Sequence, residues 1–156
     1  MKSAQNAATP NSAASGFWRV SSSRARIAPE GVIDAIASDH SPCTATEKDC
    51  EFDQAPFGAA TLEIAFAAAH EAAVLGGALD LPTLLARLST GPAGVLGLEA
   101  GTLRAGRPAD ITLVDPKARW TVGPKSLRSL AGNNPLVGRA MRGKVAATFV
   151  AGRQVA

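Results

Sequence analysis

A short apolar run that opens into a polar, proline-containing loop is the feature that most constrains the fold of this chain. Residues 32–37 are almost wholly apolar and partly β-branched, and residues 38–44 follow them directly with Asp39, His40 and Pro42. Such a run predicts a strand that helices cover on both faces, as in a parallel sheet. In a parallel α/β barrel, this end of the strand carries the catalytic groups.

Asp39 and His40 are therefore candidate catalytic residues. A carboxylate at the end of a strand can ligate a hard cation and carry a proton. In the simpler alternative, Asp39 caps the loop and the backbone satisfies His40. A zinc site of His40, Cys43 and Cys50 is disfavoured, because a structural zinc site takes four ligands with tighter paired spacing. His40 and His70 are the only two histidines, so this chain cannot complete a histidine-rich metal site.

Three helical segments are expected after this loop. Residues 61–75 place apolar side chains at helical spacing, and Gly76 and Gly77 end that helix because glycine tolerates a left-handed cap. His70 lies away from the apolar face and is expected to face solvent. Asp80 predicts the N-cap of a second helix, and a short third segment follows it. The expected buried stripes are Leu62, Ala65, Phe66, Ala69 and Ala73 on the first helix, and Leu81, Leu84, Leu85 and Leu88 on the second.

Beyond residue 99 the pattern changes to short strands separated by Gly, Pro and Asp. One strand, then helices, then several strands predict the end of an α/β unit joined to a separate β layer. The expected strands cover residues 111–114, 120–122, 145–150 and 153–155. We therefore expect a barrel segment at 31–98 and a β-layer segment at 99–156.

Residues 1–30 are expected to form a disordered or non-native leader. They are rich in Ser, Ala and Asn and hold no acidic residue before Glu30. Such a segment cannot bury enough apolar area to offset the entropy lost on ordering. A basic, acid-poor start also fits a transit peptide, which is the less favoured interpretation.

Composition favours a soluble, cytoplasmic protein. The two cysteines, with no secretory apolar segment, indicate free thiols in a reducing compartment, and no apolar stretch approaches the roughly 20 residues that cross a bilayer. Residues 41–100 hold two basic and eight acidic side chains, whereas residues 101–156 hold ten basic and two acidic ones. Because the basic residues are dispersed and no aromatic residues interleave with them, nucleic-acid binding is disfavoured. An acidic protein partner and a solvated face stay open.

The motifs of residues 31–156, in their joint order, resemble the C-terminal part of dihydroorotase, a cyclic amidohydrolase. The resemblance begins with the Ile-Ala-Ser-Asp-His-Ser-Pro motif at 36–42 and the Ala-Pro-Phe-Gly-Ala motif at 55–59. It continues through the motifs at residues 62–63, 92–93, 96–98, 101–103, 109–110, 115–116, 133–135 and 143–145.

This resemblance implies the C-terminal end of a (β/α)8 TIM-barrel amidohydrolase plus part of its flanking β-sandwich layer. Such enzymes hydrolyse the ring amide of dihydroorotate in pyrimidine biosynthesis. They hold one or two zinc ions with a His-x-His pair, a carboxylated Lys, two further histidines and an Asp. Asp39 matches that Asp, as a metal ligand and as the group that moves a proton to the departing ring nitrogen. The backbone at Pro56, Phe57 and Gly58 matches the segment that contacts the substrate.

Two departures from the family pattern affect these expectations. Cys43 stands where dihydroorotases commonly have a His that grips the substrate carboxylate, and residues 38–44 are more similar to allantoinase, whose substrate has no carboxylate. No His-x-His occurs in this chain, so zinc is not expected to be retained and the chain alone is expected to be inactive.

A third interpretation is a non-catalytic dihydroorotase-like subunit that scaffolds aspartate carbamoyltransferase, since the basic residues 101–156 suit an acidic partner. A homo-oligomer is a further alternative. An incomplete β layer with exposed edges is expected to leave the isolated chain marginally stable or prone to aggregate.

Overall fold

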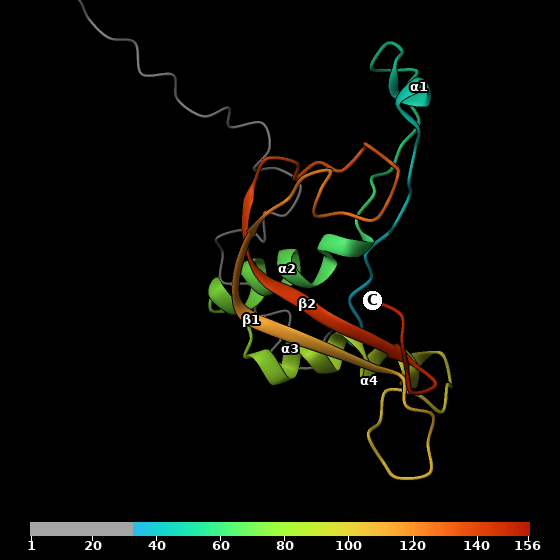
Figure 1. The fold of residues 1–156 in the computed structure, drawn as a ribbon, viewed down its shortest axis with the longest axis vertical. Coiled ribbons are helices and arrows are strands. Elements are labelled where there is room, and N and C mark those ends of the chain that lie inside the picture. The colour runs from blue at the N-terminus through green and yellow to red at the C-terminus, as the bar shows by residue number, and fades with distance from the viewer. Residues whose placement is uncertain (1–32) are drawn as a thin grey trace, which may run out of the picture.

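The computed structural model describes residues 33–156, in which short helices come first and a long β-hairpin follows (Figure 1). The predicted leader at 1–30 lies outside the described residues. The helical elements are α1 (Ala45–Lys48), η2 (Leu62–Ile64), α2 (Ala65–Ala69), η3 (His70–Leu75), α3 (Leu81–Leu88) and α4 (Thr90–Val95). The strands are β1 (Ile111–Thr121), β2 (Ala140–Val150) and β3 (Arg153–Gln154).

The strand predicted at residues 32–37 does not form in the described part of this segment, residues 33–37. These residues are extended, with one backbone hydrogen bond from Ile36 N to the carbonyl oxygen of Arg87 at 2.9 Å. Ile33 is 37% exposed rather than covered on both faces. A strand needs a neighbouring strand to bind its N–H and C=O groups, and residues 33–156 supply none beside this segment.

The helical predictions are confirmed. η2, α2 and η3 follow one another without a break from residue 62 to residue 75, and Gly77 then takes the left-handed conformation with φ of +77°. Asp80 caps α3, because its Oδ1 accepts a hydrogen bond from Thr83 N at 2.8 Å. The bonds from Thr83 hold the pKa of Asp80 below its ordinary value. The predicted third segment is α4.

The predicted strands at 111–114 and 120–122 are joined in one long strand, β1. It pairs with β2 in antiparallel register, from Ile111 opposite Phe149 to Thr121 opposite Ala140. The register shifts between Asp115 and Arg119, where Asp115 Oδ1 accepts hydrogen bonds from the next backbone amides. A bulge of this kind bends and twists the strand without ending it.

The core lies between the hairpin and the helix that begins at η2. Its buried members are Ile64, Ala67, Ala68, Val122, Leu136 and Met141. Leu62, predicted to be buried, is 62% exposed, and the fully buried side chain on this helix is Ile64 at 0%. Ala65 and Ala69 of the predicted stripe are half-buried and face residues 36–38 and Leu88. The helix therefore packs on two sides, and the side toward the sheet carries the core.

On α3, the predicted stripe is only partly buried. Leu84 is fully buried at 0% exposure, whereas Leu85 is 37% exposed. Leu81 and Leu88 are half-buried. In the described structure α3 packs mainly against η3 and α4, which leaves one leucine position facing solvent.

His70 was predicted to face solvent, and that prediction is wrong. Its ring is 3% exposed, lies stacked on Phe66 with centroids 5.7 Å apart, and its Nδ1 donates to the carbonyl oxygen of Arg142 at 3.2 Å. Gly143 allows this approach, since a Cβ there would lie 3.0 Å from His70 Nδ1. A glycine inside a strand can mark such a close contact.

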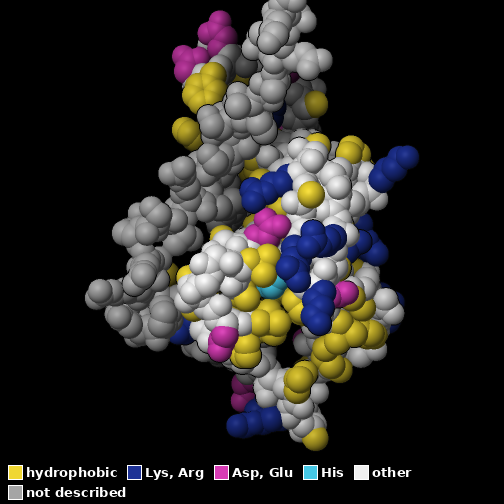
Figure 2. All heavy atoms as spheres, turned by 90° about the vertical axis from the view of Figure 1, so that its left-hand side faces the viewer, with side chains coloured by type: hydrophobic (Ala, Val, Ile, Leu, Met, Phe, Trp, Pro, Cys, Tyr) yellow, Lys and Arg dark blue, Asp and Glu magenta, His cyan; other side chains and the backbone are white. Residues whose placement is uncertain are grey.

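The surface carries exposed apolar groups and gathered basic groups. Phe52, Phe57 and Leu130 are 99%, 100% and 103% exposed. Figure 2 shows Lys and Arg side chains gathered on one face, beside a band of hydrophobic side chains. In residues 33–156 no helix is long and apolar enough to cross a membrane.

Candidate functional site

Asp39 occupies a backbone conformation that few non-glycine residues adopt. Its φ is +47°, in the left-handed region, and its side chain is exposed. Such conformations cost free energy and persist where the surrounding structure enforces them, often at functional sites. The bonds made by the two neighbouring residues provide that enforcement.

Both neighbours of Asp39 are tied to the start of the helix that begins at η2. Thr61 Oγ1 donates to the carbonyl oxygen of Ser38 at 2.6 Å. The backbone amides of Thr61 and Leu62 each donate to His40 Nδ1 at 3.1 Å. His40 is thus satisfied by backbone, as the simpler sequence-based alternative held. Thr61, which makes two of these bonds, is 2% exposed.

The segment with Pro56, Phe57 and Gly58 lies against the Asp39 loop. His40 forms a parallel bridge with Ala59, and Ser41 N donates to the carbonyl oxygen of Ala59 at 2.9 Å. Gly58 has φ of +113°, and a Cβ at this position would lie 2.3 Å from Ser41 Cβ. Only glycine allows this approach, so the structure brings the predicted substrate-contacting backbone and the predicted catalytic carboxylate onto adjoining loops.

Cys43, which stands where dihydroorotases commonly have a His, lies half-buried in the loop that carries Asp39. Its thiol makes a weak contact with the carbonyl oxygen of Ser41, at 3.9 Å. Cys43 and Cys50 are both free cysteines. Cys43 therefore lies in the loop that carries Asp39, and its thiol is free.

A zinc ion does not fit the described residues. Residues 33–156 contain no group of three or more His, Cys, Asp and Glu side chains arranged to hold a metal ion. His40 Nδ1 already accepts two backbone hydrogen bonds. Asp39 is therefore a single candidate ligand, and the alternative site of His40, Cys43 and Cys50 has no support in the described part of the chain.

Three residues to which the sequence assigned no role organise these loops: Lys48, Thr61 and Asn133. Lys48 Nζ donates to the carbonyl oxygens of Pro56 and Gly58. Asn133 Nδ2 donates to those of Ser41 and Gly58. An open hollow of about 510 Å³ lies between α1 and residues 132–133. Lys48 ends α1 and Asn133 lies in the connection between β1 and β2, and nothing in the sequence around either residue indicates which carbonyl oxygens it binds.

Comparison with known proteins agrees with the sequence resemblance. The family model described as "Amidohydrolase family" matches residues 18–155. The dihydroorotase of Geotalea daltonii is 44% identical over 126 residues, which are 81% of this chain and 29% of that protein. The dihydroorotase of Anaeromyxobacter dehalogenans is 46% identical over 126 residues, with the same coverage of 81% and 29%.

Solved structures show the same relation. The dihydropyrimidinase of Brevibacillus agri superposes with a TM-score of 0.76 at 25% identity, covering 83% of this chain and 30% of that one. The L-hydantoinase of Arthrobacter aurescens gives 0.74 at 29% identity, covering 84% and 30%. This chain therefore spans less than a third of the length of the relatives it matches, and its fold is that of the corresponding part of them.

Proposed function

This chain belongs to the amidohydrolase family, and from that premise we propose that it carries the Asp39 end of a dihydroorotase-like active site that opens a cyclic amide. The observation that carries the proposal is the identity of 44–46% to proteins named dihydroorotase over 126 residues. The adjoining Asp39 and Gly58 loops support it, because the bridge between His40 and Ala59 and the close approach of Gly58 to Ser41 hold the two predicted site segments together.

In the proposed reaction, water attacks the ring amide carbon and the ring C–N bond breaks. Asp39 accepts the proton of the attacking water and delivers it to the departing ring nitrogen, so the carboxylate ends the cycle unprotonated. Its exposed side chain and the anchored neighbours Ser38 and His40 suit a group that must keep one orientation while exchanging a proton.

For the substrate, we propose that Pro56, Phe57 and Gly58 contact the ring through their backbone and that Cys43 lies beside it. A thiol is a weak hydrogen-bond partner for a carboxylate compared with a protonated His. This favours testing allantoin, which has no carboxylate, beside dihydroorotate. Dihydroorotate is the first candidate, since the relatives at 44–46% identity are named dihydroorotase.

Zinc is proposed only for the complete site. Asp39 alone does not hold a zinc ion, and the described residues add no second ligand around it. We propose that the other ligands come from outside residues 33–156. On the same basis we propose that residues 31–98 belong to the end of a TIM barrel and residues 99–156 to its flanking β layer.

A chimera tests the proposed function. The 126 residues of the Geotalea daltonii dihydroorotase that match this chain are replaced by the matching residues of this chain. We expect the chimera to open dihydroorotate or allantoin and Asp39→Asn to abolish turnover, because the amide cannot accept a proton. A folded, zinc-loaded chimera that opens neither ring would contradict the proposal.

The non-catalytic alternative rests on the basic surface of Figure 2 and the ten basic side chains in residues 101–156. It predicts that the chain co-purifies with aspartate carbamoyltransferase at low salt and is released at high salt, since exposed charges are screened. Absence of binding at low salt would remove this alternative.

A further inference from the structure

We propose that Lys48 and Asn133 are positioning residues that hold the backbone of residues 56–58 against the Asp39 loop. We call this pair the Gly58 clamp, because both side chains bind the carbonyl oxygen of Gly58. The role of the held backbone, contact with the ring of a cyclic amide, rests on the proposed function. The clamp itself rests on the contacts below.

The ammonium group of Lys48 donates its hydrogen bonds to backbone carbonyl oxygens. Its Nζ donates to the carbonyl oxygen of Pro56 at 2.5 Å and to that of Gly58 at 3.1 Å, so it bridges both sides of Phe57. The ion pairs within residues 33–156 do not include Lys48. Hydrogen bonds from a charged donor are stronger than those between neutral groups. The Lys48 ammonium group is therefore committed to holding this turn.

Asn133 ties the same turn to two further segments. Its Nδ2 donates to the carbonyl oxygen of Ser41 at 3.0 Å and to that of Gly58 at 3.4 Å. Its own carbonyl oxygen accepts from Ala60 N at 3.3 Å. One residue from the connection between β1 and β2 thus joins the Asp39 loop to the loop that follows α1.

The clamp rigidifies a turn that has no core packing of its own. The Phe57 side chain is 100% exposed, so burial does not fix the turn. A short capped helix presents Lys48 to it: Thr44 N donates to Glu47 Oε2 at 2.7 Å, and the bonds from Thr44 lower the pKa of Glu47. A rigid backbone beneath an exposed side chain is the arrangement expected where a ligand covers the turn.

Amide hydrogen exchange in the full chain, followed by NMR, tests the clamp. Lys48→Met keeps the aliphatic stem without the donors, and Asn133→Leu removes the carboxamide at similar size. We expect exchange of the Ser41 and Ala60 amides to speed up about fivefold to tenfold in both variants, as loss of one or two hydrogen bonds implies. Lys48→Arg, which keeps charged donors, restores most of the protection.

Two controls separate local from global effects. The Gly138 amide, bound to the carbonyl oxygen of Val122 at 2.8 Å, reports on the hairpin and should keep its native rate in every variant. Lys125→Met removes an exposed lysine of the β layer and should leave Ser41 and Ala60 unchanged. Unchanged Ser41 and Ala60 exchange in Lys48→Met and Asn133→Leu, or an equal rise at Gly138, would overturn the clamp.

Kinetics of the chimera link the clamp to the substrate. Lys48→Met should raise KM about tenfold with a smaller change in kcat, since a looser turn weakens ring binding before the chemical step, and Lys48→Arg should reverse the rise. A chimera that opens no ring contradicts the proposed function while the exchange result still decides the clamp. An unchanged KM contradicts the role of the clamp in substrate binding.

Discussion

At the scale of single residues, the site depends on a conformation that Asp39 does not favour by itself. Its φ of +47° is enforced by Thr61, which bonds to Ser38 through its hydroxyl and to His40 through its amide. The sequence identifies Asp39 as a candidate, because a carboxylate follows an apolar run. It does not identify the strain, because the bonds that impose it come from a helix that starts more than twenty residues later.

Replacing Asp39 with glycine should separate stability from function. Because glycine adopts φ of +47° without a Cβ penalty, Asp39→Gly should unfold at equal or higher urea concentration, with a gain of up to about 1 kcal/mol. Asp39→Ala keeps the Cβ and should show no gain. Urea titrations followed by circular dichroism compare the three proteins. If Asp39→Gly lost more stability than Asp39→Ala, the claim that the backbone at Asp39 is strained would be contradicted.

A second residue-scale prediction concerns the cap of α3. Hydrogen bonds from Thr83 lower the pKa of Asp80 from its ordinary value, so the folded state favours the ionised form. The stabilisation is present above the unfolded value of about 3.9 and is lost as pH falls through the lowered folded value. The Thr83 amide should therefore lose protection against hydrogen exchange as the pH falls below 4. Asp80→Asn keeps an acceptor without titrating, and should remove this pH dependence.

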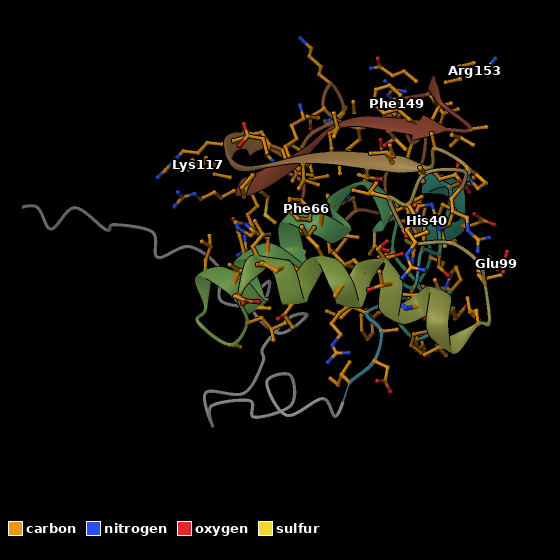
Figure 3. The ribbon with its side chains drawn as sticks, turned by 90° about the horizontal axis from the view of Figure 1, so that it is seen from below. His40, Phe66, Glu99, Lys117, Phe149 and Arg153 are labelled. Carbon is orange, nitrogen blue, oxygen red and sulfur yellow. The ribbon has the colours of Figure 1, made fainter. Side chains whose placement is uncertain are left out.

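At the scale of elements, two carboxylates on one helix hold the β layer in place. Glu63 accepts from the backbone amides of Arg128 and Ser129, at 2.7 and 3.0 Å. Glu71 accepts from Arg142 N at 2.7 Å and forms an ion pair with Arg139. Figure 3 shows Phe66 between the helices and the sheet. The contact between helix and sheet is therefore both apolar and polar.

Glu63→Ala should destabilise the chain by about 1–2 kcal/mol, because two backbone amides lose a charged acceptor in a partly buried contact. The matched control is Glu99→Ala, which removes the exposed ion pair with Arg107 and should cost less than about 0.5 kcal/mol. Urea unfolding measures both. Equal losses in the two variants would mean that Glu63 contributes no more than a surface charge.

The elements also show what sequence patterns determine. Caps and periodicity place the helices, since Asp80 and Gly77 act through bonds and conformations within a few residues. The prediction of a strand at 32–37 was wrong for residues 33–37, because a strand forms only where a neighbouring strand binds its backbone, and a local pattern does not reveal that neighbour. The burial of His70 depends on Gly143, which is distant in sequence and leaves room for the ring.

At the scale of the whole molecule, the described chain leaves much apolar surface exposed. Phe52, Phe57, Leu103 and Leu130 are each at least 83% exposed. Figure 3 shows Phe149 and Arg153 on the side of the sheet away from the helices. Three strands with a short third member present unpaired edges to solvent. Such a surface favours association over an isolated folded state.

The isolated chain should therefore unfold broadly or aggregate on heating. Calorimetry combined with light scattering, over a range of concentrations, measures the transition and the particle size together. The expected result is a weak transition with scattering that rises with concentration. A sharp, reversible transition of a monomer would contradict the expectation, because it requires a self-sufficient core.

The most direct measurement is the zinc content and ring-opening activity of the purified chain without companions. A single carboxylate at Asp39 predicts no stoichiometric zinc and no turnover of dihydroorotate or allantoin, in contrast to the active chimera. Stoichiometric zinc together with ring opening by this chain alone would contradict the account, because residues 33–156 contain no cluster able to hold the ion.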